Sequence, residues 1–268
     1  MVAKTYVLHH GACSDGFGAA WSAWKALGDK AVYLPVSYGS PVPDLKTGSH
    51  VVMLDFAYSR EVLLEMNSRM ASLLVLDHHK TAQKNIGDLD FAYFNMDKSG
   101  AILSWEYFHP REKTPEFIKY VEDKDLWRFN LEDSREVNLG IESYPREFDA
   151  WNNFDSPNSL AQLKIDGIAI KRFMTQLVKQ SVGQARITKV GGYDVPVVNT
   201  TAFPSEVGNA LCAKYPYHPF AAYYFDRKDG TRHWGFRSVG EFDVSEVAKK
   251  LGGGGHRNSA GFIESIKG

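Results

Sequence analysis

The chain has 268 residues, of which 44% are hydrophobic and 24% charged, and its net charge is −1. This composition is ordinary for a soluble globular protein, and the length suffices for one large domain or two modest ones. Residues 1–150 carry a net charge of −6, which argues against a basic nucleic-acid-binding surface in that part of the chain.

The sequence also argues against secretion and membrane insertion. Its N-terminal segment, MVAKTYVLHH, lacks the apolar region and cleavage site of a signal peptide. No apolar run approaches the roughly 18 residues that a membrane span needs, so no membrane partner is expected. The two cysteines, Cys13 and Cys212, cannot form a disulfide framework, and a cytoplasmic location is therefore expected.

Three short apolar segments in the first third are typical of buried parallel strands. They are residues 5–10, 50–56 and 72–79. Helical patterns lie between and after them, at 16–28, 59–71, 99–109 and 114–127. Ser59 is the expected N-cap of the second of these helices. The alternation predicts an α/β fold, in which a parallel sheet has helices on both faces.

A long amphipathic helix is expected from about Asn158 to Ile187, and it is typical of a connector between domains. Beyond Val190 the pattern changes to strands at 191–199, 219–238 and 260–265, with helices at 205–215 and 244–252. These elements predict a smaller mixed α/β domain. The expected organisation is therefore a domain at 1–150, a helical linker at 151–190 and a second domain at 191–268.

Side chains that can bind metals follow each of the three predicted strands. They are His9, Asp15, Asp55, Asp77, His78 and His79. Because parallel sheets bind ligands beyond the carboxyl ends of their strands, these side chains are expected to converge on one crevice. Mixed oxygen and nitrogen ligands favour divalent ions such as Mn²⁺ and Mg²⁺. So many ligands would suit two ions, a common arrangement in phosphoryl chemistry.

The segment LVLDHHKT resembles the signature of the DHH phosphoesterase superfamily. HHGACSDGFGAAW, VVMLDF and VEDKDLW resemble its first, second and fourth motifs, and GGGGHRNSAG is similar to the glycine-rich motif of the associated DHHA1 domain. All five occur in the family's order and spacing. The family includes RecJ-type exonucleases, nanoRNA and cyclic-dinucleotide phosphodiesterases, exopolyphosphatases and family II pyrophosphatases. The resemblance implies a manganese or magnesium pair in the cleft between a DHH domain and a DHHA1 domain.

The resemblance also implies a role for each motif residue. His9 would bind the first metal, Asp15 and His78 the second, and Asp55 would bridge the two. His79 would contact the phosphate or support the metal ligands from behind, and Asp77 would orient the histidines. In the fourth motif Asp123 matches the family's ligand best, and Asp125 is the alternative.

Cys13 stands where the family usually has an aspartate. A thiolate ligand there would favour Zn²⁺ or Fe²⁺, which are therefore not excluded beside Mn²⁺ and Mg²⁺. Alternatively, Cys13 lines the wall while water completes the coordination, or the first metal site is weakened. His10 is a possible substitute ligand, although strand alternation tends to send it to the side opposite His9.

The glycine-rich segment at 252–261 has two interpretations. It is either a helix cap followed by a flexible loop or a backbone that approaches an anion closely. By the resemblance it grips a substrate phosphate. The predicted substrate-binding residues are Gly254, Gly255, His256, Arg257, Arg237 and Asn199. Trp127 and Trp234 are candidates for stacking a nucleobase, although aromatic residues more often pack in a core.

The function expected from the resemblance is hydrolysis of phosphodiester bonds by metal-activated water. The expected substrates and partners are short oligonucleotides or small linear or cyclic dinucleotides. Two alternatives stay open: a hydrolase of polyphosphate or pyrophosphate, and a nucleotide- or nucleic-acid-binding module that has lost catalysis. Whether the chain forms a homodimer also stays open.

Overall fold

The computed structural model describes residues 3–11, 13–37 and 39–266. The chain comprises two compact units, Met1–Lys171 and Arg172–Gly268. The division falls inside helix α8 (Ser159–Gly183), whereas the sequence predicted a separate linker at 151–190. Gly140 and Gly167 explain why the first half of α8 belongs to the first unit. A Cβ on either glycine would meet the backbone of the opposite helix, α6 or α8, so the two helices pack at very close range.

A five-stranded parallel sheet forms the centre of the first unit, in the order β2-β1-β3-β4-β5. Its strands are β1 (Thr5–His10), β2 (Ala31–Val36), β3 (His50–Leu54), β4 (Ser72–Asp77) and β5 (Ala92–Phe94). The predicted parallel α/β fold is confirmed. The sequence missed the two edge strands because β2 contains a proline and β5 has only three residues.

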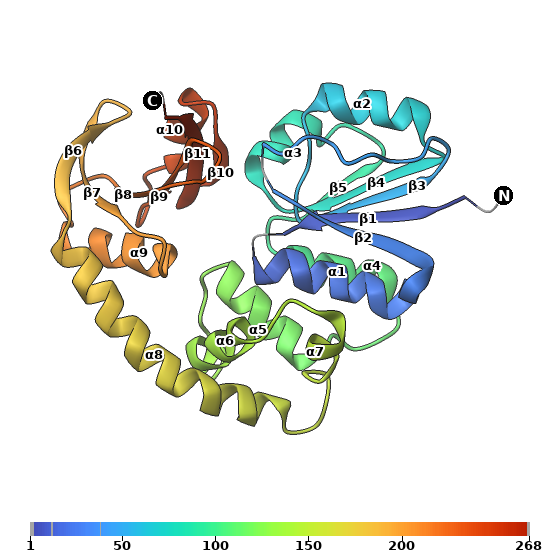
Figure 1. Ribbon diagram of the computed structural model, residues 1–268, viewed down its shortest axis with the longest axis horizontal. Helices are drawn as coiled ribbons and strands as arrows, with labels where there is room; N and C mark the ends of the chain where they lie inside the picture. Colours follow the sequence, from blue (N-terminus) through green and yellow to red (C-terminus); the bar gives the residue numbers. More distant parts are fainter. Residues whose placement is uncertain (1–2, 12, 38, 267–268) are drawn as a thin grey trace. The chain divides into compact units, whose positions relative to one another are not determined.

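Helices cover both faces of this sheet, as Figure 1 shows: α2 and α3 lie on one face, and α1 and α4 on the other. They are α1 (Ser14–Leu27), α2 (Arg60–Arg69), α3 (Lys80–Ile86) and α4 (Gly100–Phe108), with a short 3-10 helix, η1 (Gly28–Lys30), after α1. Leu63 and Met66 of α2 are buried against the strands on one face, and Ala19 and Ala23 of α1 on the other.

Three more helices extend the first unit beyond the sheet. They are α5 (Glu116–Asp125), α6 (Ser134–Ser143) and α7 (Phe148–Asn152). Together with α1 and α4 they enclose an aromatic core that includes Trp21, Phe117 and Trp151, each fully buried. This core fixes the end of α5 relative to the sheet, which matters for the site described below.

The second unit contains a six-stranded mixed sheet in the order β10-β11-β9-β8-β7-β6. Its strands are β6 (Arg186–Val190), β7 (Tyr193–Asn199), β8 (Ala221–Asp226), β9 (Thr231–Arg237), β10 (Gly254–His256) and β11 (Ser259–Ser265). Helices α9 (Pro204–Lys214) and α10 (Val244–Lys250) pack on residues that alternate along the strands and therefore cover opposite faces. The predicted mixed α/β unit is confirmed.

Within the residues described, no helix combines the length with the apolar character that crossing a bilayer requires.

Candidate metal centre

The carboxyl ends of β1, β3 and β4 bring acidic and imidazole side chains together, as their parallel arrangement predicts. Asp55 follows β3 directly, Asp77 is the last residue of β4, and His78 follows it. All three are buried, with at most 1% of each exposed. Asp55 has φ of +62°, a left-handed conformation that is uncommon for residues other than glycine and is often found at functional sites.

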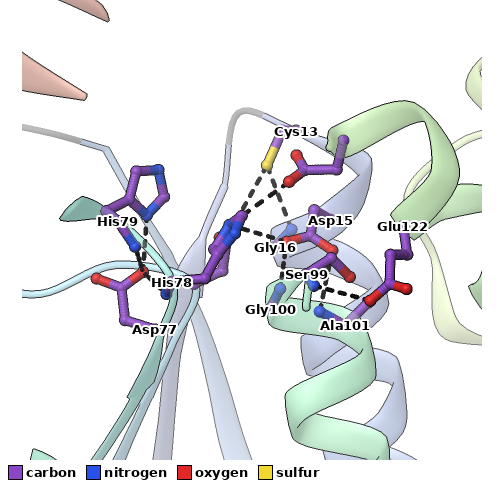
Figure 2. A network of polar contacts seen from close by, with 12 residues as sticks. Cys13, Asp15, Gly16, Asp77, His78, His79, Ser99, Gly100, Ala101 and Glu122 are labelled. Carbon is purple, nitrogen blue, oxygen red and sulfur yellow. Dashed lines mark hydrogen bonds and ion pairs between the residues drawn. The ribbon is translucent and has the colours of Figure 1, made fainter. Parts of the chain in front are cut away.

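The imidazole of His78 lies among three carboxylates. Its Nε2 is 3.1 Å from Asp55 Oδ1, 3.6 Å from Asp15 Oδ2 and 3.5 Å from Asp125 Oδ2. Figure 2 shows His78 and Asp77 at the edge of the sheet, with Asp15 and the start of α1 opposite them. Three carboxylates, from α1, α5 and the residue after β3, therefore surround one nitrogen atom of His78.

Asp15 is held by the N-terminus of α4. Its two carboxylate oxygens accept hydrogen bonds from the backbone amides of Gly100 (2.6 Å) and Ala101 (2.9 Å), and the positive end of the helix favours the negative charge. A Cβ at Gly100 would lie 2.6 Å from Asp55 Cβ and 2.9 Å from Asp15 Oδ2. The site therefore requires glycine at position 100.

Cys13 links the start of α1 to Asp55. Its Sγ accepts the backbone amide of Gly16 at 3.2 Å, which makes the thiol the N-cap of α1, and it donates to Asp55 Oδ2 at 3.3 Å. His10 Nδ1 lies 3.1 Å from the same sulfur and 3.4 Å from Asp55 Oδ2. His10, Cys13 and Asp55 thus form a second group of ligand-type atoms close enough to share one ion.

Asp77 orients the two histidines that follow it. Its Oδ1 accepts hydrogen bonds from His79 Nδ1 (2.7 Å) and from the backbone amides of His78 (2.7 Å) and His79 (3.2 Å). Its Oδ2 is buried and accepts no hydrogen bond from the part of the chain that the structure describes. A carboxylate in this state can orient imidazoles and still offer lone pairs to a cation.

The charges of these groups show why a cation would be favourable. Burial raises the pKa of Asp15 well above its ordinary value, and the negative charges of Asp125 and Asp55 raise it further. Burial also opposes protonation of His78, but the hydrogen bond with Asp55 and the charges of the three carboxylates outweigh it and raise the pKa of His78 well above its ordinary value. Without a metal, the imidazolium supplies the positive charge that the carboxylates require.

His9 lies inside β1, and its role as a ligand of the first metal stays a prediction. His9 is buried in β1, with its ring centroid 6.0 Å from that of Phe17, and burial lowers its pKa to about 4. It is therefore neutral at pH 7, the state that metal binding needs, but it is not among the described residues whose ligand atoms cluster. His10, the last residue of β1, is in that cluster, so the two neighbouring histidines have different surroundings, as strand alternation predicts.

Asp123 is not in the cluster of described residues either. Its carboxylate accepts the backbone amides of Asn130 (2.9 Å) and Leu131 (3.2 Å), and it is 5% exposed. Asp125, the alternative from the sequence, is the residue that faces His78. The structure thus assigns Asp123 to the turn after α5 and brings Asp125 to the candidate site.

The glycine-rich segment is a hairpin rather than a loop. Gly254, Gly255 and His256 form β10, which pairs with β11. Gly255 has φ of +139°, and a Cβ there would lie 2.5 Å from the Ser259 carbonyl oxygen, so this hairpin needs glycine. Gly252 ends α10 as expected, with φ of +83° and its amide bonded to the Lys249 carbonyl.

The other residues predicted to bind substrate in the second unit have partners within it. Arg237 donates to Ser205 Oγ at 2.6 Å, and Asn199 donates to the Tyr224 carbonyl at 3.2 Å. Arg257 pairs with Glu241 at 2.7 Å on the surface. Their contribution to substrate binding stays a prediction. The ring of Trp234 lies parallel to that of Phe262, with centroids 6.0 Å apart. Trp234 therefore packs against another aromatic residue of this unit, as aromatic residues more often do.

The donor set fits divalent metal ions. It offers carboxylates, imidazoles and one thiol. In the first unit these residues form three groups, and the ligand atoms within each group lie within 4.8 Å of one another. Asp55 and His78 each belong to two of the three groups. Oxygen and nitrogen donors suit Mn²⁺ and Mg²⁺, and sulfur suits Zn²⁺ and Fe²⁺. Shared ligands are typical of a site for two ions.

Comparison with known proteins identifies the class. No family model matches the chain. It is 30% identical over 292 residues to uncharacterized protein R106 of Acanthamoeba polyphaga mimivirus, with 98% of the chain and 68% of that protein covered. It is 23% identical over 214 residues to oligoribonuclease NrnB of Bacillus subtilis. This second match covers 70% of the chain but only 51% of NrnB, so the chain spans about half of that relative.

Two solved structures share the fold. The pGpG-specific phosphodiesterase PggH from Vibrio cholerae has a TM-score of 0.50 at 14% identity, with 98% of this chain and 94% of that one covered. Exonuclease RecJ bound to manganese has a TM-score of 0.50 at 13% identity, with 97% and 85% covered. The chain shares the α/β fold of these two structures. The chain belongs to the DHH/DHHA1 phosphoesterase superfamily.

Proposed function

We propose that the chain is a metal-dependent phosphodiesterase that hydrolyses short oligonucleotides or small linear or cyclic dinucleotides. The observation that carries this proposal is the convergence of Asp15, Asp55 and Asp125 on His78 at the carboxyl edge of a parallel sheet. The names of two relatives, an oligoribonuclease and a pGpG-specific phosphodiesterase, support a nucleotide substrate.

Asp55 is the residue best placed to bridge two ions. Its Oδ1 faces His78, and its Oδ2 faces Cys13 and His10. One ion would be held by His10, Cys13 and Asp55, and the other by Asp55, His78, Asp15 and Asp125. When bound, such ions supply an activated water and polarise the phosphate oxygens. The proposed cofactors are two divalent ions, Mn²⁺ or Mg²⁺, with Zn²⁺ or Fe²⁺ left open by Cys13.

The chain's own residues have three tasks in this reaction. Asp77 keeps His79 oriented, and His79 is the candidate for contacting the phosphate. The start of α4 holds the carboxylate of Asp15 in place. His78 gives up its proton when a metal binds, because an imidazolium cannot coordinate. In the second unit, Gly254, Gly255, His256, Arg257, Arg237 and Asn199 remain the candidates for binding substrate.

Hydrolysis of a panel of phosphate compounds tests the function. The panel contains a linear dinucleotide, a cyclic dinucleotide, a short oligonucleotide and polyphosphate, each with Mn²⁺, Mg²⁺, Zn²⁺ and Co²⁺. We expect metal-stimulated release of mononucleotides from the nucleotide substrates. Turnover of polyphosphate alone would favour a phosphoanhydride hydrolase. If no compound is hydrolysed, the alternative of a binding module without catalysis is favoured instead.

Cys13 sets the metal preference if it coordinates. Burial, reinforced by the charge of Asp55, raises the pKa of its thiol well above the ordinary value, so a metal would have to displace the proton. We expect Cys13→Asp to shift the preference roughly tenfold or more from Zn²⁺ or Fe²⁺ toward Mn²⁺ and Mg²⁺, because a hard oxygen replaces a soft sulfur. Metal content and rate, measured for each ion, report this shift.

Cys13→Ser is the matched control for that experiment. Serine preserves a good N-cap for α1 but removes the sulfur, so a change in metal preference reports coordination rather than loss of the cap. If Cys13→Ala retains the wild-type metal content and rate, the thiol packs and does not coordinate.

A further inference from the structure

The turn after α5 holds two aromatic residues in a conformation that aromatic residues seldom adopt. Trp127 has φ of +55° and Phe129 has φ of +51°. Left-handed backbone at bulky residues is disfavoured and persists only where the surrounding structure imposes it. Two such residues, separated only by Arg128, make this turn a candidate for a functional role.

Asp123 imposes this conformation. Besides the two amides that its carboxylate accepts, its carbonyl oxygen accepts the backbone amides of Arg128 (2.8 Å) and Phe129 (3.2 Å). One buried residue therefore accepts four amides of the turn. The turn is fixed from inside the protein, and its aromatic side chains are preorganised.

The two rings and one arginine form a single surface, which we call the aromatic shelf: Trp127, Phe129 and Arg135. The rings meet edge to face with centroids 4.9 Å apart. The guanidinium of Arg135 lies 3.6 Å from the centroid of Phe129 and 5.8 Å from that of Trp127. Both rings are half-buried and Arg135 is exposed. Among the residues described, Arg135 forms no ion pair, so its charge is available to an anionic ligand.

The shelf follows a residue of the candidate metal centre closely in the chain. Asp125, whose carboxylate lies 3.5 Å from His78 Nε2, is two residues before Trp127. Consecutive Cα atoms are about 3.8 Å apart, so the Cα atoms of these two residues lie within about 8 Å. The backbone that carries the shelf therefore begins within a few ångströms of the residue that faces the candidate metal centre.

We propose that the aromatic shelf binds a nucleobase next to the scissile phosphate and makes the enzyme selective for base-bearing phosphodiesters. This proposal rests on the proposed function. Aromatic rings stack on the faces of bases without regard to sequence, and a guanidinium adds a cation–π contribution and attracts phosphate. A chain of phosphoanhydrides has no ring to place there, so the shelf favours nucleotides over polyphosphate.

The test compares a dinucleotide with an analogue that lacks one base, using the full chain with Mn²⁺. For Trp127→Ala we expect the ratio of kcat/KM for the dinucleotide over that for the abasic analogue to fall about tenfold, mainly through KM, as the energy of base–aromatic stacking implies. Trp127→Phe is expected to restore most of the ratio, because it keeps an aromatic face.

Arg135→Gln and Arg128→Gln form a matched pair. Both arginines are exposed, but Arg128 pairs with Glu122 and the Asp97 carbonyl instead of lying on a ring. We expect a lower ratio for Arg135→Gln and the wild-type ratio for Arg128→Gln. Circular dichroism and metal content confirm that each variant is folded and loaded.

Two results would overturn the proposal, and they are distinguishable. If wild type hydrolyses the dinucleotide but Trp127→Ala and Arg135→Gln leave the ratio unchanged, the shelf is structural and the proposed function stands. If wild type hydrolyses neither compound, the proposed function fails and the shelf proposal fails with it.

Discussion

Replacing Asp55 with asparagine is expected to lower the metal-stimulated rate of hydrolysis by about a thousandfold or more and to reduce bound metal. The carboxylate uses both oxygens: Oδ1 faces His78, and Oδ2 faces Cys13 and His10. An amide keeps the size but replaces one of the two oxygens with an NH2 group, which cannot coordinate a cation, and it carries no charge. Since a bound ion supplies several kcal/mol of transition-state stabilisation, and each 1.36 kcal/mol is a tenfold change in rate, losing it has a large effect.

Metal analysis and single-substrate kinetics with Mn²⁺ measure this prediction. Asp29→Asn provides the matched control, because Asp29 is an exposed carboxylate of the same unit and lies in η1, outside the cluster. If Asp55→Asn bound as much metal as wild type, the assignment of the metal centre to this sheet edge would be wrong.

Gly100→Ala is expected to disrupt the same centre without removing any ligand. The added methyl would lie 2.6 Å from Asp55 Cβ and 2.9 Å from Asp15 Oδ2, so α4 or both carboxylates must move. We expect a loss of about 1 to 3 kcal/mol in the free energy of unfolding, as for other overpacked sites. Displaced ligands should also weaken Mn²⁺ binding by roughly tenfold or more, since ligand placement by supporting groups has effects of that size.

Gly183→Ala is the matched control, because it makes the same substitution at a position where the added methyl group has free space. Gly183 is the last residue of α8, and a Cβ there would meet nothing within 4 Å. We expect that variant to be neutral or slightly stabilised, because alanine is the better helix former. Urea unfolding and Mn²⁺ titration of both variants provide the comparison. Equal behaviour of the two would show that the close approach at Gly100 carries no cost.

The sequence was most informative where local pattern and fold coincide. Asp55, Asp77 and His78 each follow a short apolar segment, and parallel strands gather ligands at their carboxyl ends, so the sequence predicts that the three residues lie together. The need for glycine at position 100 and the left-handed conformation of Asp55 could not be predicted from the local sequence, because both depend on how closely α4 approaches the end of β3.

Two features of the site depend on where elements end, which is the least predictable part of a sequence. His10 ends β1 and Cys13 is the N-cap of α1, so the contact between them depends on where the strand ends and the helix begins. The glycine run was expected either to bind an anion or to form a flexible loop, and it pairs as β10 because β11 offers a partner strand. Pairing of this kind depends on tertiary structure, so the local sequence could not reveal it.

The separate positions of Asp123 and Asp125 bear on how related sequences should be aligned. Residues two apart on an α-helix are rotated by about 200° around its axis, so the two acids of this D-x-D pattern project to nearly opposite sides of α5. One accepts amides beneath the turn, and the other faces His78. Asparagine at the first position would accept only one of the two amides, because its other terminal atom is an NH2 donor, and at the second position it would lose the negative charge that faces His78. A relative with asparagine at the first position and aspartate at the second therefore retains the candidate ligand, whereas the reverse pattern loses it, although both have the same composition.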